Sequence, residues 1–327
     1  MTNLVYHSSI YRGYLEQNNI RKDLEVEFFK HILSNCYPTD LFINSTWGEV
    51  DNLLIELINR KPKRAVIYSG MDWENTVCRK IFHEYIKSNV KDIIYIGNSD
   101  GIGYFSFWLF FIEKHFLSYS LKELELINPE YLYMCLNRKR HSHRVQIVKR
   151  LKEELLLEHG IVSLGGDSDM RLSTDVEARV NTERSDYNPS DIPNDICSIG
   201  HLANWNKYLI NIVTETTVHT NTFISEKTWK PIIGLRPFMI VGDRKIYSYL
   251  KEYGIDTFDD IFGTGYQDPI VEKRIEWVID NLKRYSNTNL VEMYKQLYPR
   301  LVRNKLQLQE IFKINNSRYQ GVINIIK

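Results

Sequence analysis

Short apolar runs alternate along this sequence with longer segments of helical periodicity, and this alternation limits the fold more than any other feature. The runs have the length and composition of buried strands: Asp40–Asn44, Ala65–Tyr68, Asp92–Gly97, Tyr131–Leu136, Asn211–Glu215 and Pro237–Gly242. The segments with helical spacing are Leu24–Leu33, Leu53–Ile58, Thr76–Lys87, Val145–His159, Ser225–Ile233, Tyr247–Tyr253 and Ile270–Arg284. Strand–helix–strand units of this length are typical of parallel sheets covered by helices, so we predict an α/β fold.

The chain is long enough for two domains of ordinary size, since it has 327 residues. A polar stretch near Ser118–Glu130 separates two series of strands. We therefore expect a Rossmann-like domain at residues 1–125, a second one at 126–285 that faces it across a cleft, and a helical segment at 286–327. In open α/β sheets ligands bind beyond the carboxyl ends of the strands, so we expect the functional residues in strand-end loops.

The composition is that of a globular chain without a charge bias. Lys and Arg number 42 and Asp and Glu 41, so the net charge does not support a dedicated polyanion binder. The four cysteines include no CxxC pair, which excludes a disulfide scaffold and fits a reducing compartment. The first residues show no secretory signal, and the longest apolar run, Ile102–Ile112, is too short to span a bilayer. We expect a cytoplasmic protein without a membrane span, with interfacial membrane contact of that run as the alternative.

The most informative segment is Ile212–Asp243. A strand there brings Glu215 to its carboxyl end, and Ser225 stands where it can cap the next helix. Glu226 and Lys227 then fall in the first helical turn, where a lysine is unfavourable unless an anion lies in front of it. Helix-start amides with a lysine suit a diphosphate, and Glu226 could accept hydrogen bonds from ribose hydroxyls. The alternative is an ordinary cap with a solvated Glu–Lys pair.

A second cluster is the basic segment Asn137–Arg144, which joins the end of a strand to the start of a helix. The guanidinium groups of Arg138 and Arg144 could hold phosphate oxygens in bidentate fashion. A solvated basic loop is the alternative. Cys135 and the two histidines of this segment could also be read as zinc ligands, but the spacing is unsuitable and a fourth ligand is missing, so we expect no metal.

These elements resemble the C-terminal nucleotide-sugar-binding segment of the family-10 glycosyltransferases, the α1,3-fucosyltransferases. The matching residues are Val213–Glu215, Ile224–Lys227 and Pro237–Gly242. The sequence is similar as well to glycosyltransferase-like proteins of bacteriophages and large viruses, in which S-E-K-T-x-K-P-I precedes P-F-x-I-x-G. As in those proteins, a segment of the type L-x-x-x-G-hydrophobic-x-T-F follows, here Leu250–Phe258. The resemblance covers roughly residues 130 to 285.

The resemblance implies a two-domain GT-B architecture, a nucleotide-diphosphate sugar as donor and no obligatory metal. It also implies that the C-terminal domain holds most of the donor. Thr216 stands where the family carries Asn, so the resemblance does not specify the sugar. The predicted donor-binding residues are Arg144 and, as second choice, Arg138, together with Glu215, Ser225, Glu226 and Lys227.

Transfer of a sugar with inversion needs a carboxylate that takes the proton from the acceptor hydroxyl. Asp72 follows the strand at Ala65–Tyr68, and Asp100 follows the strand at Asp92–Gly97. Both are therefore candidate catalytic bases, with Asp72 first and Glu74 third. Either aspartate could instead form a turn or cap a helix.

The last segment, Ser286–Lys327, holds seven basic and two acidic residues. Leu297, Leu301, Leu308 and Ile311 have helical spacing, so we expect one face of this segment to pack on a domain. The excess of basic residues indicates either a solvent-exposed helix face or a surface that contacts a nucleic-acid acceptor.

We predict a glycosyltransferase that moves a sugar from a nucleotide-diphosphate donor to an acceptor hydroxyl, on a hydroxymethylated base in phage DNA or on a glycan. The alternative is a non-catalytic module of the same fold that binds a nucleotide, a glycan or nucleic acid. A dehydrogenase is disfavoured because Asn98–Gly103 lacks the third glycine of the dinucleotide fingerprint. Phosphate-loop, kinase and nucleophile-elbow motifs are absent from the sequence.

Overall fold

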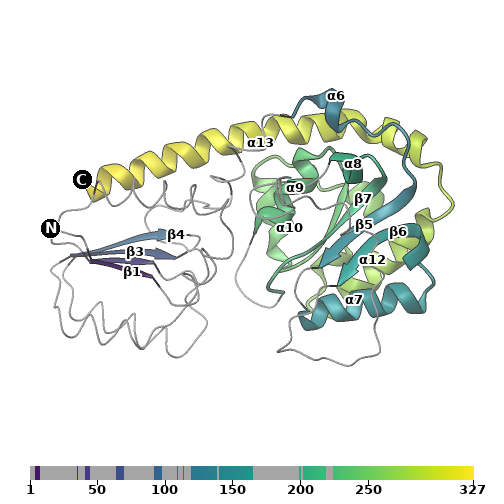
Figure 1. Ribbon diagram of the computed structural model, residues 1–327, viewed down its shortest axis with the longest axis horizontal. Coiled ribbons are helices and arrows are strands. Elements are labelled where there is room, and N and C mark those ends of the chain that lie inside the picture. The colour runs from purple at the N-terminus through teal and green to yellow at the C-terminus, as the bar shows by residue number, and fades with distance from the viewer. Residues whose placement is uncertain are drawn as a thin grey trace. The chain divides into compact units, whose positions relative to one another are not determined.

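The computed structural model describes residues 119–137, 140–164, 202–218 and 224–327, the strand segments 4–7, 41–44, 64–69 and 92–97, and residues 35, 109, 113 and 199. The chain forms two compact units: one comprises Met1–Phe111 with Phe312–Lys327, and the other comprises Ile112–Ile311. The sequence predicts boundaries after residues 125 and 285. Each unit contains a four-stranded sheet (Figure 1).

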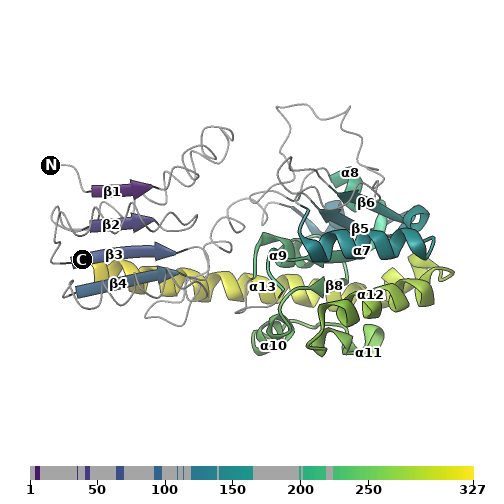
Figure 2. The same cartoon turned by 90° about the horizontal axis from the view of Figure 1, so that it is seen from below.

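In the first unit the strands lie side by side in chain order, as Figure 2 shows. They are β1 (Leu4–His7), β2 (Leu41–Asn44), β3 (Arg64–Ser69) and β4 (Asp92–Gly97), and each neighbouring pair is parallel. The predictions of β2, β3 and β4 are confirmed, whereas β1 is not predicted. The predicted helices at 24–33, 53–58 and 76–87 lie outside the described residues.

The sheet of the second unit is also parallel, but its strand order differs from the chain order. It consists of β5 (Tyr131–Asn137), β6 (Gly160–Leu164), β7 (Tyr208–Thr214) and β8 (Phe238–Val241), in the order β6-β5-β7-β8. Every residue of β7 and β8 is buried. Such continuous burial is expected where helices cover both faces of a parallel sheet, and it explains the unbroken apolar runs in the sequence.

Helices surround this second sheet (Figure 1). The described ones are α6 (Leu121–Leu124), α7 (Ser142–Glu153), η1 (Leu157–His159), α8 (Leu202–Trp205), α9 (Glu226–Ile233), α10 (Lys245–Glu252), α11 (Asp259–Phe262), η3 (Gly265–Gln267), α12 (Val271–Tyr285) and, up to Ile311, α13 (Leu290–Ile326). α7 and α12 pack against each other, and Arg150 of α7 forms an ion pair with Glu276 of α12 at 2.9 Å. α9, which connects β7 to β8, contacts β7. The predictions of α9, α10 and α12 are confirmed to within a few residues.

Two local predictions for the second unit need correction. The sequence suggests that Gly160 ends a helix, but it is the first residue of strand β6. The ring of Tyr133 lies against it there and leaves no room for a side chain. A Cβ added there would lie 2.3 Å from Cζ of Tyr133. The helix predicted to begin at Val145 begins at Ser142, so His143 and Arg144 lie in its first turn rather than in a loop. Strand β6 ends at Leu164, and residues 165–198 lie outside the described residues.

A buried arginine connects α9 and β8 to the rest of the second unit. Arg236 is 0% exposed and donates hydrogen bonds to the backbone carbonyls of Leu124, Trp205 and Tyr208. It also donates to the carbonyls of Gly234 and Leu235 beside it in the chain. Because these acceptors are buried carbonyls, the cation has a structural role.

The helical prediction for the C-terminal segment is confirmed by α13. Leu297, Leu301, Leu308 and Ile311 are all buried, with 3% or less of each residue exposed. Among the described residues, no helix combines the length and the apolar character that crossing a membrane requires.

Candidate functional site

The strand order of the second sheet defines a topological switch point between β5 and β7. From β5 the chain crosses through α7 to β6 on one side, whereas β7 lies on the other side of β5 and leads through α9 to β8. In open α/β sheets the carboxyl ends at such a point are where ligands bind. The described residues at this edge come from the start of α7, the segment after β7 and the start of α9.

Glu215 immediately follows β7, and its carboxylate is directed to the start of α9. The residue is 0% exposed. Its Oε1 accepts hydrogen bonds from the Ser225 amide at 3.0 Å and from Thr228 Oγ1 at 2.7 Å. Its Oε2 accepts a hydrogen bond from Ser225 Oγ at 2.6 Å. Glu215, predicted as a donor-binding residue, therefore contacts the helix start rather than the solvent.

Ser225 is the N-cap of α9, as the sequence predicts. Its Oγ accepts a hydrogen bond from the Lys227 amide at 3.3 Å. The same oxygen accepts a hydrogen bond from the Lys227 ammonium, whose Nζ lies 3.1 Å away. A single hydroxyl thus connects the backbone and the side chain of Lys227 to Glu215.

Glu226 and Lys227 form an ion pair at the first turn of α9. Lys227 Nζ lies 3.1 Å from Glu226 Oε1, with 30% of the lysine side chain and 10% of the glutamate side chain exposed. Lys230, one turn further along, is buried as well. Burial opposes ionisation of Glu226, but the charges of Lys227 and Lys230 hold its pKa below the ordinary value. In this pair the glutamate is mostly buried and the lysine is partly exposed.

The first turn of α7 fixes the end of β7. Arg144 Nη2 donates to the Thr214 carbonyl at 2.9 Å, and His143 Nε2 lies 2.8 Å from the Glu215 carbonyl. Because a carbonyl only accepts, this nitrogen of His143 carries the proton. Burial lowers the pKa of Arg144, and the charges of Glu215 and Glu226 act in the opposite direction. Arg144 therefore brings positive charge to the carboxyl edge from within the protein.

A further basic residue at this edge, which is not among the predicted site residues, is Arg274 of α12. It is 2% exposed and donates to the carbonyls of Val218 and Asp268, both at 2.8 Å. The signal in the sequence is an arginine on the apolar face of α12, where a charged side chain needs buried partners. Together with His143 and Arg144, it fixes the backbone that leaves β7.

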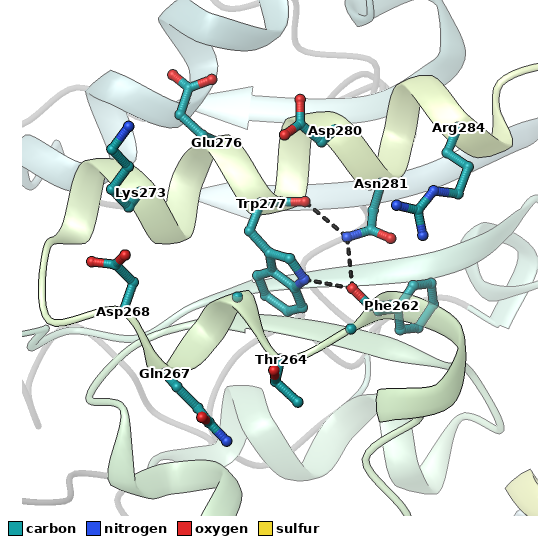
Figure 3. A pocket seen from close by; sticks show the side chains of 12 residues that line it. Phe262, Thr264, Gln267, Asp268, Lys273, Glu276, Trp277, Asp280, Asn281 and Arg284 are labelled. Carbon is teal, nitrogen blue, oxygen red and sulfur yellow. Dashed lines mark hydrogen bonds between the residues drawn. The ribbon is translucent and has the colours of Figure 1, made fainter.

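The structure also contains an open hollow of about 680 Å³ between α12 and the segment Phe262–Asp268 (Figure 3). None of the described donor-binding candidates lines it. The polar groups at its centre bind one another, since Trp277 Nε1 and Asn281 Nδ2 both donate to the Phe262 carbonyl, at 2.6 and 2.9 Å. We therefore place the candidate site at the strand ends, where the predicted residues converge.

The described residues do not support the zinc alternative. Among them, no three His, Cys, Asp or Glu side chains are arranged to hold a metal ion. Cys135 is fully buried, and burial raises the pKa of its thiol to about 11.

The remaining predicted site residues lie outside the described residues. They are the candidate bases Asp72 and Asp100, the third choice Glu74, and the second-choice phosphate ligand Arg138. The structure thus brings together Arg144, Glu215, Ser225, Glu226 and Lys227 at one edge of the second sheet. In comparisons with known proteins, no family model, curated protein or solved structure matches this chain.

Proposed function

We propose that this protein is a glycosyltransferase of the GT-B type, which moves a sugar from a nucleotide-diphosphate donor to an acceptor hydroxyl. The observation that carries the proposal is the Lys227 ammonium, which is partly exposed at the capped start of α9 on the carboxyl edge of a parallel sheet. A helix start with an added ammonium is a favourable place for a diphosphate.

In this proposal Lys227 stabilises the departing diphosphate. An ammonium has three N–H donors, and Ser225 and Glu226 engage two of them, so the third can meet a phosphate oxygen. As the bond between the anomeric carbon and the diphosphate oxygen breaks, negative charge grows on that oxygen. A fixed cation there lowers the barrier without a metal.

The other residues of the edge have supporting roles in the proposal. Glu226 accepts hydrogen bonds from the ribose hydroxyls, and Arg144 adds positive charge behind the diphosphate. The acceptor oxygen bonds to the anomeric carbon while its proton passes to a carboxylate, for which Asp72 and Asp100 are the predicted candidates. The acceptor is a glycan or a hydroxymethylated base in DNA.

The first test measures donor binding. A thermal-shift panel with UDP, GDP, CMP, ADP and their sugars is run on the wild type, on Lys227→Ala and on Lys245→Ala. Lys245 is the matched control, because it is an exposed lysine in the first turn of α10, which follows a neighbouring strand of the same sheet. A ligand at 100 times its dissociation constant stabilises a protein by about 2.7 kcal/mol, which visibly raises the midpoint.

We expect one nucleoside diphosphate to raise the midpoint of the wild type and of Lys245→Ala, and Lys227→Ala to bind it roughly tenfold more weakly. No shift with any nucleotide, or equal binding by Lys227→Ala, would contradict the donor site. Consumption of the nucleotide sugar in the presence of an acceptor then separates an enzyme from a non-catalytic binding module.

A further inference from the structure

Two segments that are separate from Glu215 in the sequence lie around its side chain. Besides Ser225 and Thr228 of the α9 start, Gly242 at the end of β8 lies against the side chain. A Cβ added to Gly242 would lie 2.6 Å from Cδ1 of Ile246, 3.2 Å from Cβ of Glu215 and 3.3 Å from Cγ of Glu215. These distances are tighter than ordinary contacts, so the absence of a side chain at Gly242 leaves room for the side chains of both Ile246 and Glu215.

The hydroxyl of Ser225 connects this buried carboxylate to Lys227. Ser225 Oγ donates its only proton to Glu215 Oε2 at 2.6 Å, because a carboxylate can only accept. Its two lone pairs are then available to the amide and the ammonium of Lys227, at 3.3 and 3.1 Å. Glu215 therefore fixes the direction of the Ser225 O–H bond. It thereby also fixes the direction of the oxygen lone pair that accepts the hydrogen bond from the Lys227 ammonium.

We propose that Glu215 is a positioning residue of the diphosphate site. It orients the Lys227 ammonium through Ser225 and does not itself contact the nucleotide sugar. This inference rests on the proposed function, in which Lys227 binds the diphosphate. It assigns Glu215 a different task from direct donor contact, since the residue is 0% exposed.

The decisive substitution is Glu215→Gln, which preserves shape and removes the second acceptor oxygen. If the amide nitrogen faces Ser225 Oγ, the serine proton must turn toward the donors of Lys227. If the amide nitrogen instead faces the Ser225 backbone, it meets that N–H group. In either orientation two hydrogen-bond donors face each other. The hydrogen bonds that hold the Lys227 ammonium in place are therefore disrupted.

Binding is measured by calorimetry with inorganic diphosphate, GDP and UDP. We expect Glu215→Gln and Ser225→Ala each to weaken binding roughly tenfold, the loss of one hydrogen bond to a charged group. Thr228→Val is the matched control, because it removes a hydroxyl that also binds Glu215 but does not lead to Lys227. It should lower the urea midpoint while diphosphate affinity stays that of the wild type. Glu252→Gln controls for the charge change at an exposed position.

A second readout does not depend on any ligand. Lysine acetylation rates are measured by mass spectrometry, with Lys245 as the internal reference. Lys227 should react severalfold faster in Glu215→Gln and Ser225→Ala than in the wild type or Thr228→Val, since a held ammonium is less available. If the wild type binds none of the three diphosphates, the proposed function fails, and the acetylation rates still decide whether Glu215 holds the Lys227 ammonium through Ser225.

The inference is overturned if Lys227 reacts at the same rate in Glu215→Gln as in the wild type. It is also overturned if Thr228→Val changes binding and reactivity as much as Glu215→Gln does, because the effect would then be general loss of structure. Should Glu215→Gln fail to fold, Ser225→Ala against Thr228→Val makes the same comparison.

Discussion

At the scale of the residue, the second unit uses buried basic side chains to bind backbone carbonyls. Arg144 and His143 bind the end of β7, and Arg274 binds Val218 a few residues further on. Each of these side chains is 3% exposed or less. A buried cation is stable only where acceptors surround it, so these contacts fix the backbone at the strand ends and leave a positive environment there.

The pKa of Glu226 makes the stability of this edge depend on pH. The folded state holds this pKa below its ordinary value of 4.5. The stabilisation that the carboxylate provides is therefore complete above that value and is lost as the pH falls through the lower folded value. Glu226→Gln should lower the free energy of unfolding at about pH 7, and the difference from the wild type should shrink at about pH 4.

Urea denaturation at both pH values measures this effect. Glu252→Gln, at an exposed glutamate in α10, is the control for the loss of one carboxylate at both pH values. If the free energy of unfolding of Glu226→Gln differs from that of the wild type by the same amount at both pH values, the lowered pKa of Glu226 is contradicted.

At the scale of the element, most strands and helices of the second unit could be predicted because their signals are local. β7 and β8 are continuous apolar runs, and α9 has a serine cap followed by an acidic first turn. β6 is not predicted, because its first residue is a glycine. A glycine is needed there because the ring of Tyr133, 27 positions earlier in the sequence, leaves no room for a side chain. A glycine required by a distant ring cannot be distinguished in the sequence from one that ends a helix.

A pair of glycine substitutions tests this explanation of β6. Gly160→Ala should destabilise the protein by about 1–3 kcal/mol, because the new methyl group must displace the Tyr133 ring. That ring is held by a hydrogen bond from its hydroxyl to the Leu156 carbonyl at 3.0 Å. Gly321→Ala, in α13, meets nothing within 4 Å and should stabilise the protein by up to about 1 kcal/mol. Equal urea midpoints for the two variants would contradict the steric argument.

At the scale of the whole molecule, one helix contributes to both units. Residues up to Ile311 of α13 belong to the second unit, and Phe312–Lys327 belong to the first. Within the first unit, Arg64 Nη2 of β3 donates to the Ile326 carbonyl at 2.7 Å. The end of the chain is therefore part of the fold of its first unit.

A chain truncated after Ile311 should show which unit depends on this segment. Its removal deletes the buried side chains of Phe312, Tyr319 and Ile323. Amide hydrogen exchange followed by mass spectrometry should detect faster exchange in β3, with little change in β7. Equal loss of protection in both strands, or none in β3, would contradict this division.

The sequence by itself determined the α/β character, most of the strands and the capped start of α9, because periodicity and capping depend on neighbouring residues. It also identified Arg144, Glu215, Ser225, Glu226 and Lys227 as a group. Only the tertiary structure decided what these side chains bind. Arg144 and the Thr214 carbonyl are 70 positions apart, and Glu215 and Ser225 are 10 apart. These groups meet because of the order of the strands and the space left at Gly242. Neither of these features can be recognised in a local sequence pattern.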